Sequence, residues 1–453
     1  MNKTNNSQLS LSLRSTMPLL ALAATLGAAP VVAQTDEDSF AADLADSVSI
    51  GLFVEADYDD NIRKAEANEK ADLKQIIGVN FGANYTTRSI DLATQYSLTH
   101  EEYQHDSYDG KTRLEGYLSA LFSSNPERYS WVFKHQQSIG LISSQDVSTT
   151  DNIDQRSTFT TGPDVKLRIT PVDMLTVSGR YIDTRFDESE NNDTQRGQVQ
   201  LNWGHSLSQF THIGLNASHT EVDAEEDGKG YEQQRLGVSF SSQFRYGQYS
   251  IEVGGSNLTR DDANIDDVNG VYGNFNYTTS WAGQSFGASV NRDITDSSVG
   301  LSLYIDPESD FQNGDNNFNS FDVITRTRYQ VFYRRTSPDG RLGGSITLAH
   351  DIEDYSTELQ DQENSSVRMG LDYQLTQNIN AFIDLSLEQA DFTDQDFLGE
   401  DQDVDVAIGI NHNIRPNWDF RYVVSYEQRD NSDVASREYQ SLGGYIRISY
   451  QFR

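Results

Sequence analysis

The sequence predicts an all-β protein: a single up-and-down antiparallel transmembrane β-barrel of about 20 strands. Apolar and polar residues alternate over segments of about ten residues along most of the chain, as in strands with one lipid face and one wet face. The 453 residues are only 36% hydrophobic yet 11% aromatic, whereas disordered chains are poor in aromatic residues. Short turns also alternate with long acidic segments, which resemble periplasmic turns and extracellular loops.

Composition excludes several other classes of protein. The formal net charge of -35 would repel phosphate backbones, so we expect no nucleic-acid partner. The chain has no cysteine, which excludes a disulfide scaffold. No run approaches the roughly 20 apolar residues of a membrane-spanning helix, which excludes an inner-membrane helical protein.

The N-terminal residues predict an export signal. Lys3 and Arg14 precede an apolar stretch, Met17 to Ala29, and small residues precede a cleavage site before Gln34. We therefore expect a cleaved signal peptide at residues 1–33, a short periplasmic segment at 34–46 and the barrel at 47–453. With so short a segment before the first strand, we expect a barrel without a folded plug domain.

Alternation defines individual strands. Ile50, Leu52 and Val54 share one face of the first strand, and in the strand 323–333 we expect Val323 and Tyr329 to face lipid. Counting such segments gives about 20 strands, and a count of 18 also fits, because barrels of this class have an even number. The segment 299–305 has the alternation of a strand. If it lay in the wall, however, the strands after it would run in the wrong direction for the short turns that flank them. We therefore place it in a long external loop, 294–320, our candidate constriction.

Two further groups of residues are typical of outer-membrane barrels. One marks the membrane–water interface, and the other is an assembly signal in the last strand. Four tryptophans lie beside short turns and predict a periplasmic aromatic girdle: Trp131, Trp203, Trp281 and Trp418. The last strand resembles the assembly signal of outer-membrane barrels: Gly443, Ile446, Ile448, Tyr450 and Phe452, with Ser441 before them. The expected partners are outer-membrane lipid, lipopolysaccharide and the barrel-assembly machinery. The expected location is the outer membrane of a Gram-negative bacterium.

Basic residues should line the lumen, opposite to each strand's apolar face. The predicted pore-lining set is Lys166, Arg168, Arg180, Arg235, Arg245, Arg326, Arg328, Arg334, Arg368, Arg421 and Arg447. Guanidinium groups bind carboxylates and phosphates in a bidentate manner, so one reading is a ladder that guides an anionic polymer. The other reading is structural pairing with inward acids. The candidates for that pairing are Glu115, Glu252, Asp372, Asp384 and Glu388.

The remaining motifs predict no enzyme, cofactor or metal site. The string Gly283 to Gly287 matches a nucleophile elbow, but no helix follows it, as the elbow requires. The eight histidines have no metal-ligand spacing. Acidic segments such as 223–227 and 401–405 have two readings, solvated loops or Ca²⁺ sites that bridge to lipopolysaccharide.

Three segments carry a resemblance to a known family: Tyr58 to Arg63, Arg128 to Trp131, and Phe159 to Val165 with its continuation to Tyr181. Together they resemble the beta-barrel porin (second type) family of outer-membrane proteins. The resemblance implies export of an exopolysaccharide with a periplasmic export assembly, and it implies no catalytic residues. A general diffusion porin for small solutes and a structural surface protein with cation-binding acidic loops are the alternatives.

Overall fold

The computed structural model describes residues 47–125, 128–143, 146–225, 229–262, 265–298, 321–356, 361–392 and 399–452. The expected signal peptide, the segment 34–46 and the ambiguous segment 299–305 lie outside these residues. No helix within the described ranges is long and apolar enough to cross a bilayer.

The described residues form twenty β-strands and three 3-10 helices, η1 (Thr150–Asn152), η2 (Glu190–Asn192) and η4 (Ala435–Arg437). The strands are β1 (Val48–Asp59), β2 (Asp72–Thr86), β3 (Ile90–Tyr103), β4 (Lys111–Asn125), β5 (Tyr129–Leu141), β6 (Ile153–Arg168), β7 (Asp173–Phe186), β8 (Thr194–Ser206), β9 (Thr211–Ala224), β10 (Tyr231–Phe244), β11 (Gly247–Arg260), β12 (Val268–Trp281), β13 (Gln284–Asp296), β14 (Val323–Thr336), β15 (Leu342–Tyr355), β16 (Gln362–Thr376), β17 (Ile379–Asp391), β18 (Glu400–Arg415), β19 (Trp418–Asn431) and β20 (Tyr439–Phe452).

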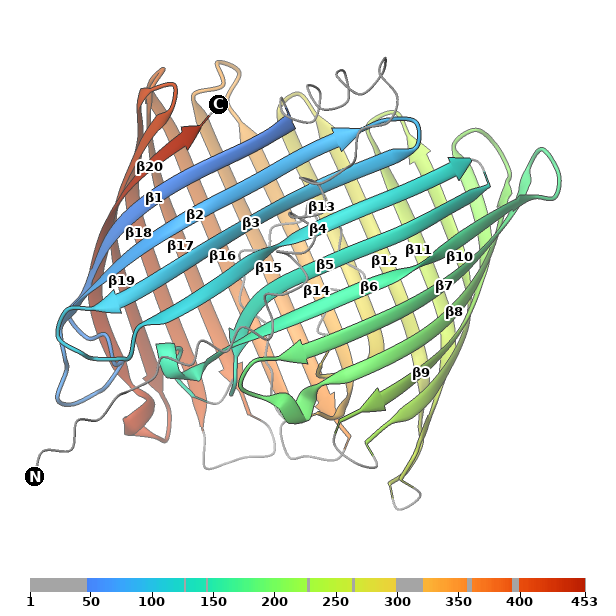
Figure 1. The fold of residues 1–453 in the computed structure, drawn as a ribbon, viewed down its shortest axis with the longest axis horizontal. Helices are drawn as coiled ribbons and strands as arrows, with labels where there is room; N and C mark the ends of the chain where they lie inside the picture. Colours follow the sequence, from blue (N-terminus) through green and yellow to red (C-terminus); the bar gives the residue numbers. More distant parts are fainter. Residues whose placement is uncertain are drawn as a thin grey trace, which may run out of the picture. The chain divides into compact units, whose positions relative to one another are not determined.

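Each strand pairs antiparallel with the next, and β20 pairs with β1 to close the sheet (Figure 1). The closing register runs from Ile50 opposite Phe452 to Asp59 opposite Gly443. Closure removes the two free edge strands of an open sheet, whose unpaired backbone groups a bilayer would not tolerate. The predicted barrel of about 20 strands is confirmed, and the 18-strand count is wrong.

Short and long connections alternate around the barrel. Arg245 and Tyr246 alone join β10 to β11, whereas residues 60–71 join β1 to β2. We assign the short-turn end to the periplasm and the long-loop end to the outside, as in bacterial barrels of this type.

The outer face is apolar and the inner face is polar. On β1, Leu52 and Val54 are exposed on the outer face, while Phe53 and Glu55 between them are buried on the inner face. Side chains alternate between the two faces of a strand, so an outward residue fixes the direction of its neighbours. The same rule places β10 and β11 with Leu236 and Val253 outward.

The end of the β13–β14 hairpin leaves the wall. Pairing of β12 with β13 stops at Arg292, although β12 itself continues toward the long loop. Beyond that point Ile294 and Val323 pack in an apolar cluster with inward residues of β9, β10 and β11, and Phe321 joins them. Val323 is therefore 2% exposed inside the barrel, and our prediction that it faces lipid is wrong. The strand β13 also extends into the segment 294–296, which we had assigned to the loop.

Candidate functional site

The lumen wall carries ten of the eleven predicted pore-lining bases on its strands. Arg245 is the exception, because it lies in the short turn after β10, with its guanidinium carbon 5.0 Å from the ring centroid of Tyr246. Our placement of Arg245 in the wall is therefore corrected. The other bases lie on β6, β7, β10, β14, β16, β19 and β20.

Five of these bases form ion pairs with carboxylates. Their pairs are Arg180–Asp164 at 2.6 Å, Arg235–Asp293 at 2.6 Å, Arg326–Glu353 at 3.1 Å, Arg328–Asp351 at 3.5 Å and Arg447–Glu55 at 2.6 Å. All five acids differ from those that we singled out from the sequence. Glu252, for example, instead accepts hydrogen bonds from Asn216 and Tyr272. Four of these pairs tie neighbouring strands together and Arg235–Asp293 links β10 to β13, so structural pairing describes this subset.

Four bases make no ion pair with the described part of the chain: Lys166, Arg168, Arg334 and Arg421. Arg168 and Arg334 are exposed near the short-turn end of the wall. Arg421 differs from them, because its guanidinium carbon lies 4.8 Å from the ring centroid of Phe382, on the wall itself.

A buried polar cluster anchors the inward end of the β13–β14 hairpin. Arg196 on β8 donates to Asp296 at 2.6 Å and to the hydroxyl of Ser298 at 2.7 Å. Tyr231 donates to the second carboxylate oxygen of Asp296 at 2.5 Å. Arg156 on β6 donates to the backbone carbonyl of Ser298 at 3.3 Å. The hairpin end is thus held against the inner face of β6–β11, where it narrows the lumen.

This anchor was missed from the sequence. Arg196 and Asp296 are separated by 100 positions, and their side chains are 4% and 0% exposed. The available signal was an inward arginine on β8 at the external end of its strand. We had assigned the constriction to the loop 294–320, and residues 299–320 lie outside the described residues.

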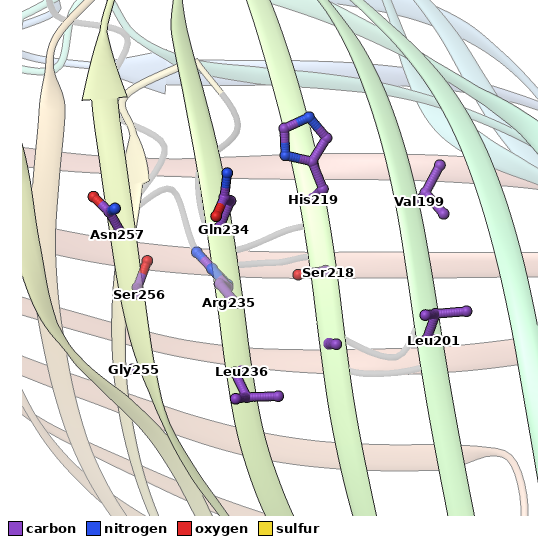
Figure 2. A pocket seen from close by; sticks show the side chains of 11 residues that line it. Val199, Leu201, Ser218, His219, Gln234, Arg235, Leu236, Gly255, Ser256 and Asn257 are labelled. Carbon is purple, nitrogen blue, oxygen red and sulfur yellow. The ribbon is translucent and has the colours of Figure 1, made fainter.

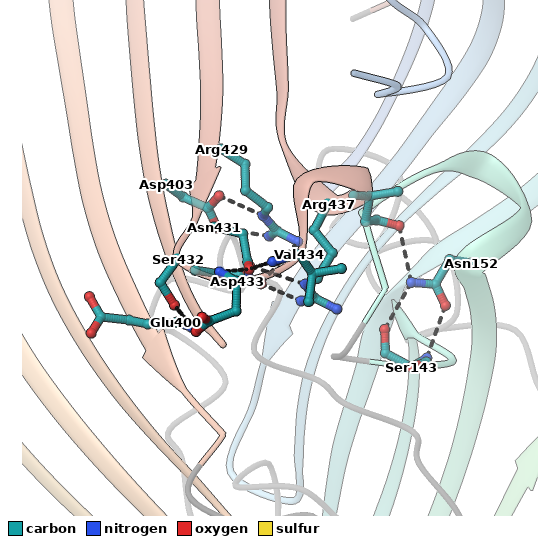
Figure 3. Close-up of polar contacts among 12 residues, drawn as sticks. Ser143, Asn152, Glu400, Asp403, Arg429, Asn431, Ser432, Asp433, Val434 and Arg437 are labelled. Carbon is teal, nitrogen blue, oxygen red and sulfur yellow. Dashed lines mark hydrogen bonds and ion pairs between the residues drawn. The ribbon is translucent and has the colours of Figure 1, made fainter. Parts of the chain in front are cut away.

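A second polar cluster lies at the external end of β18 and β19 (Figure 3). Arg429 binds Asp403 through two hydrogen bonds of 2.7 Å each, and Arg437 of η4 binds the buried Asp401. The amide of Asn431 donates to the same Asp401 at 2.6 Å. We had read 401–405 as an acidic loop, but these residues belong to β18, and two of the three acids neutralise arginines.

The connection between β1 and β2 also folds onto this inner surface. Lys64 forms an ion pair with Glu427 on β19, and its amine lies 5.1 Å from the ring centroid of Tyr439. Asn61 is fully buried and donates to the backbone carbonyl of Gln440 at 2.9 Å. The external end of the lumen is therefore narrowed from two sides.

The four tryptophans all lie at the short-turn end of their strands. Trp131 and Trp418 begin or nearly begin β5 and β19, Trp281 ends β12, and Trp203 lies near the end of β8. Their strand parity directs them outward, and Trp418 contacts Tyr450 with ring centroids 4.9 Å apart. Their role as an interfacial girdle stays a prediction.

The predicted assembly signal forms the second half of β20. Every second residue of this half faces outward: Ile446, Ile448, Tyr450 and Phe452. Of these, Ile446 and Phe452 are well exposed. Gly443 pairs with Asp59 at the closing seam. Recognition of this strand by the assembly machinery stays a prediction.

One hollow in the wall opens on the lipid side, not into the lumen. Its volume is about 670 Å³. Figure 2 shows Val199, Leu201 and Leu236 around it, all exposed outward residues, with His219 at one end. The small side chain of Ala217 and the missing side chain of Gly255 leave the space open. We therefore assign no solute site to this hollow.

The other sequence motifs fall on ordinary hairpins. Gly283, with φ of +77°, turns β12 into β13, and Ser285 is the second residue of β13. The string thus lacks the strand-to-helix turn of a nucleophile elbow. Across the described ranges, no group of three or more His, Cys, Asp or Glu side chains is arranged to hold a metal ion.

A closed sheet with an apolar outer face and a polar lumen is built to span an outer membrane. The chain is a Gram-negative outer-membrane β-barrel. No family model and no curated protein matches its sequence. Among solved structures it is similar to the FrpB iron transporter from Neisseria meningitidis, with TM-score 0.45, 9% identity and coverage of 89% of this chain and 82% of that chain.

Two further solved structures are similar to this chain. The siderophore receptor PirA from Pseudomonas aeruginosa has TM-score 0.45 and 9% identity, with coverage of 90% of this chain and 80% of that chain. The outer membrane protein OpdK from Pseudomonas aeruginosa has TM-score 0.40 and 10% identity, with coverage of 90% and 99%. Similarity at this level carries no argument about what the barrel binds or transports.

Proposed function

We propose that this barrel is a channel that conducts a secreted exopolysaccharide outward, together with a periplasmic export assembly. The observation that supports it best is the wall: twenty strands enclose a polar lumen that carries fixed cations. A barrel of 16–18 strands already leaves an aqueous channel, so a wall of this size has room for a polymer strand.

The distribution of charge supports outward passage of an acidic polymer. Lys166, Arg168 and Arg334 lie near the periplasmic end without ion pairs in the described chain, while the external connections are rich in Asp and Glu. A basic entrance attracts an anionic chain, and an acidic exit discourages its return. We further propose membership of the beta-barrel porin (second type) family, based on the segments 58–63 and 159–181.

Deletion of the chain tests this proposal. We expect exopolysaccharide to accumulate in the periplasm or to disappear from the medium, and expression of the wild-type chain to restore secretion. Unchanged secreted and periplasmic polysaccharide would reject the conduit.

A general diffusion porin is the second candidate, and it is favoured only by the strand number, because twenty strands leave an aqueous channel. Single-channel conductance separates the two functions, because a diffusion porin conducts small ions and solutes steadily without an export partner. The third reading, a surface protein with cation-binding acidic loops, loses part of its support, because Asp401 and Asp403 already pair with arginines.

A further inference from the structure

Arginines and aromatic rings alternate across five neighbouring strands of the lumen wall, β17 to β20 and β1. The row consists of Phe382 on β17, Arg421 on β19, Tyr445 and Arg447 on β20, and Phe53 on β1. The guanidinium carbon of Arg421 lies 4.8 Å from the Phe382 ring centroid and 6.0 Å from that of Tyr445. That of Arg447 lies 4.6 Å from Phe53 and 5.8 Å from Tyr445. We name these five residues the arginine–aromatic row.

Glycines allow the rings at the two ends of the row, Phe53 and Phe382, to lie flat on the inner face of the wall. Phe53 pairs with Gly78 on β2, and Phe382 pairs with Gly409 on β18. A Cβ at Gly78 would come within 2.2 Å of the Phe53 ring, and one at Gly409 within 2.4 Å of the Phe382 ring. Each ring therefore occupies the space of a missing side chain, as in aromatic rescue of strand glycines. Rings fixed in this way hold the guanidinium groups in defined positions.

Arg421 is a cation held in place without a carboxylate partner. It pairs in register with Arg447 on the adjacent strand, an arrangement of like charges that is destabilising by itself. Arg447 is neutralised by Glu55 at 2.6 Å. Arg421 has no ion pair or hydrogen bond with the described chain, and its Nε is buried without a partner. Asp384 and Asp419 lie close enough to interact with it electrostatically but not within ion-pair distance.

We infer that Arg421, within the arginine–aromatic row, binds the carboxylate of an acidic sugar unit as the polymer passes. The planar guanidinium edge matches a carboxylate in a bidentate manner, and the carboxylate would relieve the repulsion between Arg421 and Arg447. Glu55, Asp384 and Asp419 on the same face limit the attraction, so the ligand is held briefly and released. This inference rests on the proposed function and names its substrate class.

The test uses the purified full-length barrel in planar bilayers at about 0.15 M salt, where charges farther than about 8 Å are largely screened. Oligogalacturonate, a neutral malto-oligosaccharide of equal length and inorganic phosphate serve as blockers of the ion current. The variants are Arg421→Gln, Arg421→Lys and, as a matched control, Arg113→Gln. Arg113 is a β4 arginine that pairs with Glu101 at 3.0 Å.

We expect oligogalacturonate to block the wild-type channel at lower concentration than the neutral oligomer. Arg421→Gln should weaken this block about tenfold or more, as expected for a lost charged hydrogen bond. Arg421→Lys should retain only part of it, and Arg113→Gln should retain it. Equal loss in Arg113→Gln would show a general field effect and overturn the site. Block by phosphate at the concentrations of the oligomer would overturn the saccharide assignment.

A closed channel still allows the test, because a ligand that binds the folded barrel raises its unfolding temperature. Oligogalacturonate should then raise that temperature for the wild type and not for Arg421→Gln, and no rise for the wild type overturns the inference. The deletion experiment separates the proposed conduit function from the acidic-sugar site at Arg421. Preferred binding of the acidic oligomer with unchanged polysaccharide secretion rejects the conduit alone, whereas lost secretion without that preference rejects only the acidic-sugar site.

Discussion

Removal of the Asp296 carboxylate should release the inward end of the β13–β14 hairpin. In an Asp296→Ala variant, Arg196 would keep its charge at 4% side-chain exposure with no carboxylate beside it. Leaving one partner of a buried ion pair without the other costs about 3–5 kcal/mol. The hydrogen bond from Tyr231 would also be lost, at roughly 1 kcal/mol. The apolar contacts of Ile294, Phe321 and Val323 oppose release but gain nothing from the substitution.

Single-channel conductance and hydrogen exchange measure this release. We expect Asp296→Ala to conduct more than the wild type, and the amides near Ile294 and Val323 to exchange faster. The matched control is Asp183→Ala, which breaks an ion pair to Arg185, a residue that is 67% exposed, and should cost at most about 1 kcal/mol. Wild-type conductance together with wild-type exchange at the hairpin end would refute the anchoring role of the buried pair.

Three more predictions follow from individual contacts. Burial raises the pKa of Asp193, between η2 and β8, to about 6, so its protonated form favours the folded hairpin: this stability is full below about pH 3.8 and is lost as pH rises through 6. Amide exchange at the β7–β8 tip should accelerate between pH 5 and 7, and in Asp193→Asn it should not. Gly409→Leu should displace the Phe382 ring and lower the midpoint of thermal unfolding, whereas Gly204→Leu, which meets open space, should not. Trp418→Ala should lower the same midpoint more in lipid vesicles than in detergent, and an equal loss in both would contradict an interfacial role.

The wall was predictable from the sequence because its signal is local. Alternation at Leu52 and Val54 fixes the direction of Phe53 and Glu55 without knowledge of any other strand. Connection lengths added the parity of the strands, from which we expected 299–305 to lie outside the wall; that segment is not among the described residues, so this stays a prediction.

The interior was less predictable, because its contacts join distant parts of the chain. Nothing near Asp296 in the sequence indicates Arg196, and nothing near Val323 indicates that its strand has left the wall. The direction of an arginine could be read from alternation. Its partner could not, because the acids of Arg447 and Arg326 are set by the register between strands.

The closing seam has a consequence for assembly. Phe53 and Arg447 are neighbours only once β1 has paired with β20, and they are separated by almost the whole length of the barrel sequence. The arginine–aromatic row is therefore incomplete in a half-inserted or open sheet, because Phe53 then lies apart from Arg447. An acidic saccharide that contacted the whole row would bridge the β1–β20 ladder, so its full contact surface requires the closed barrel.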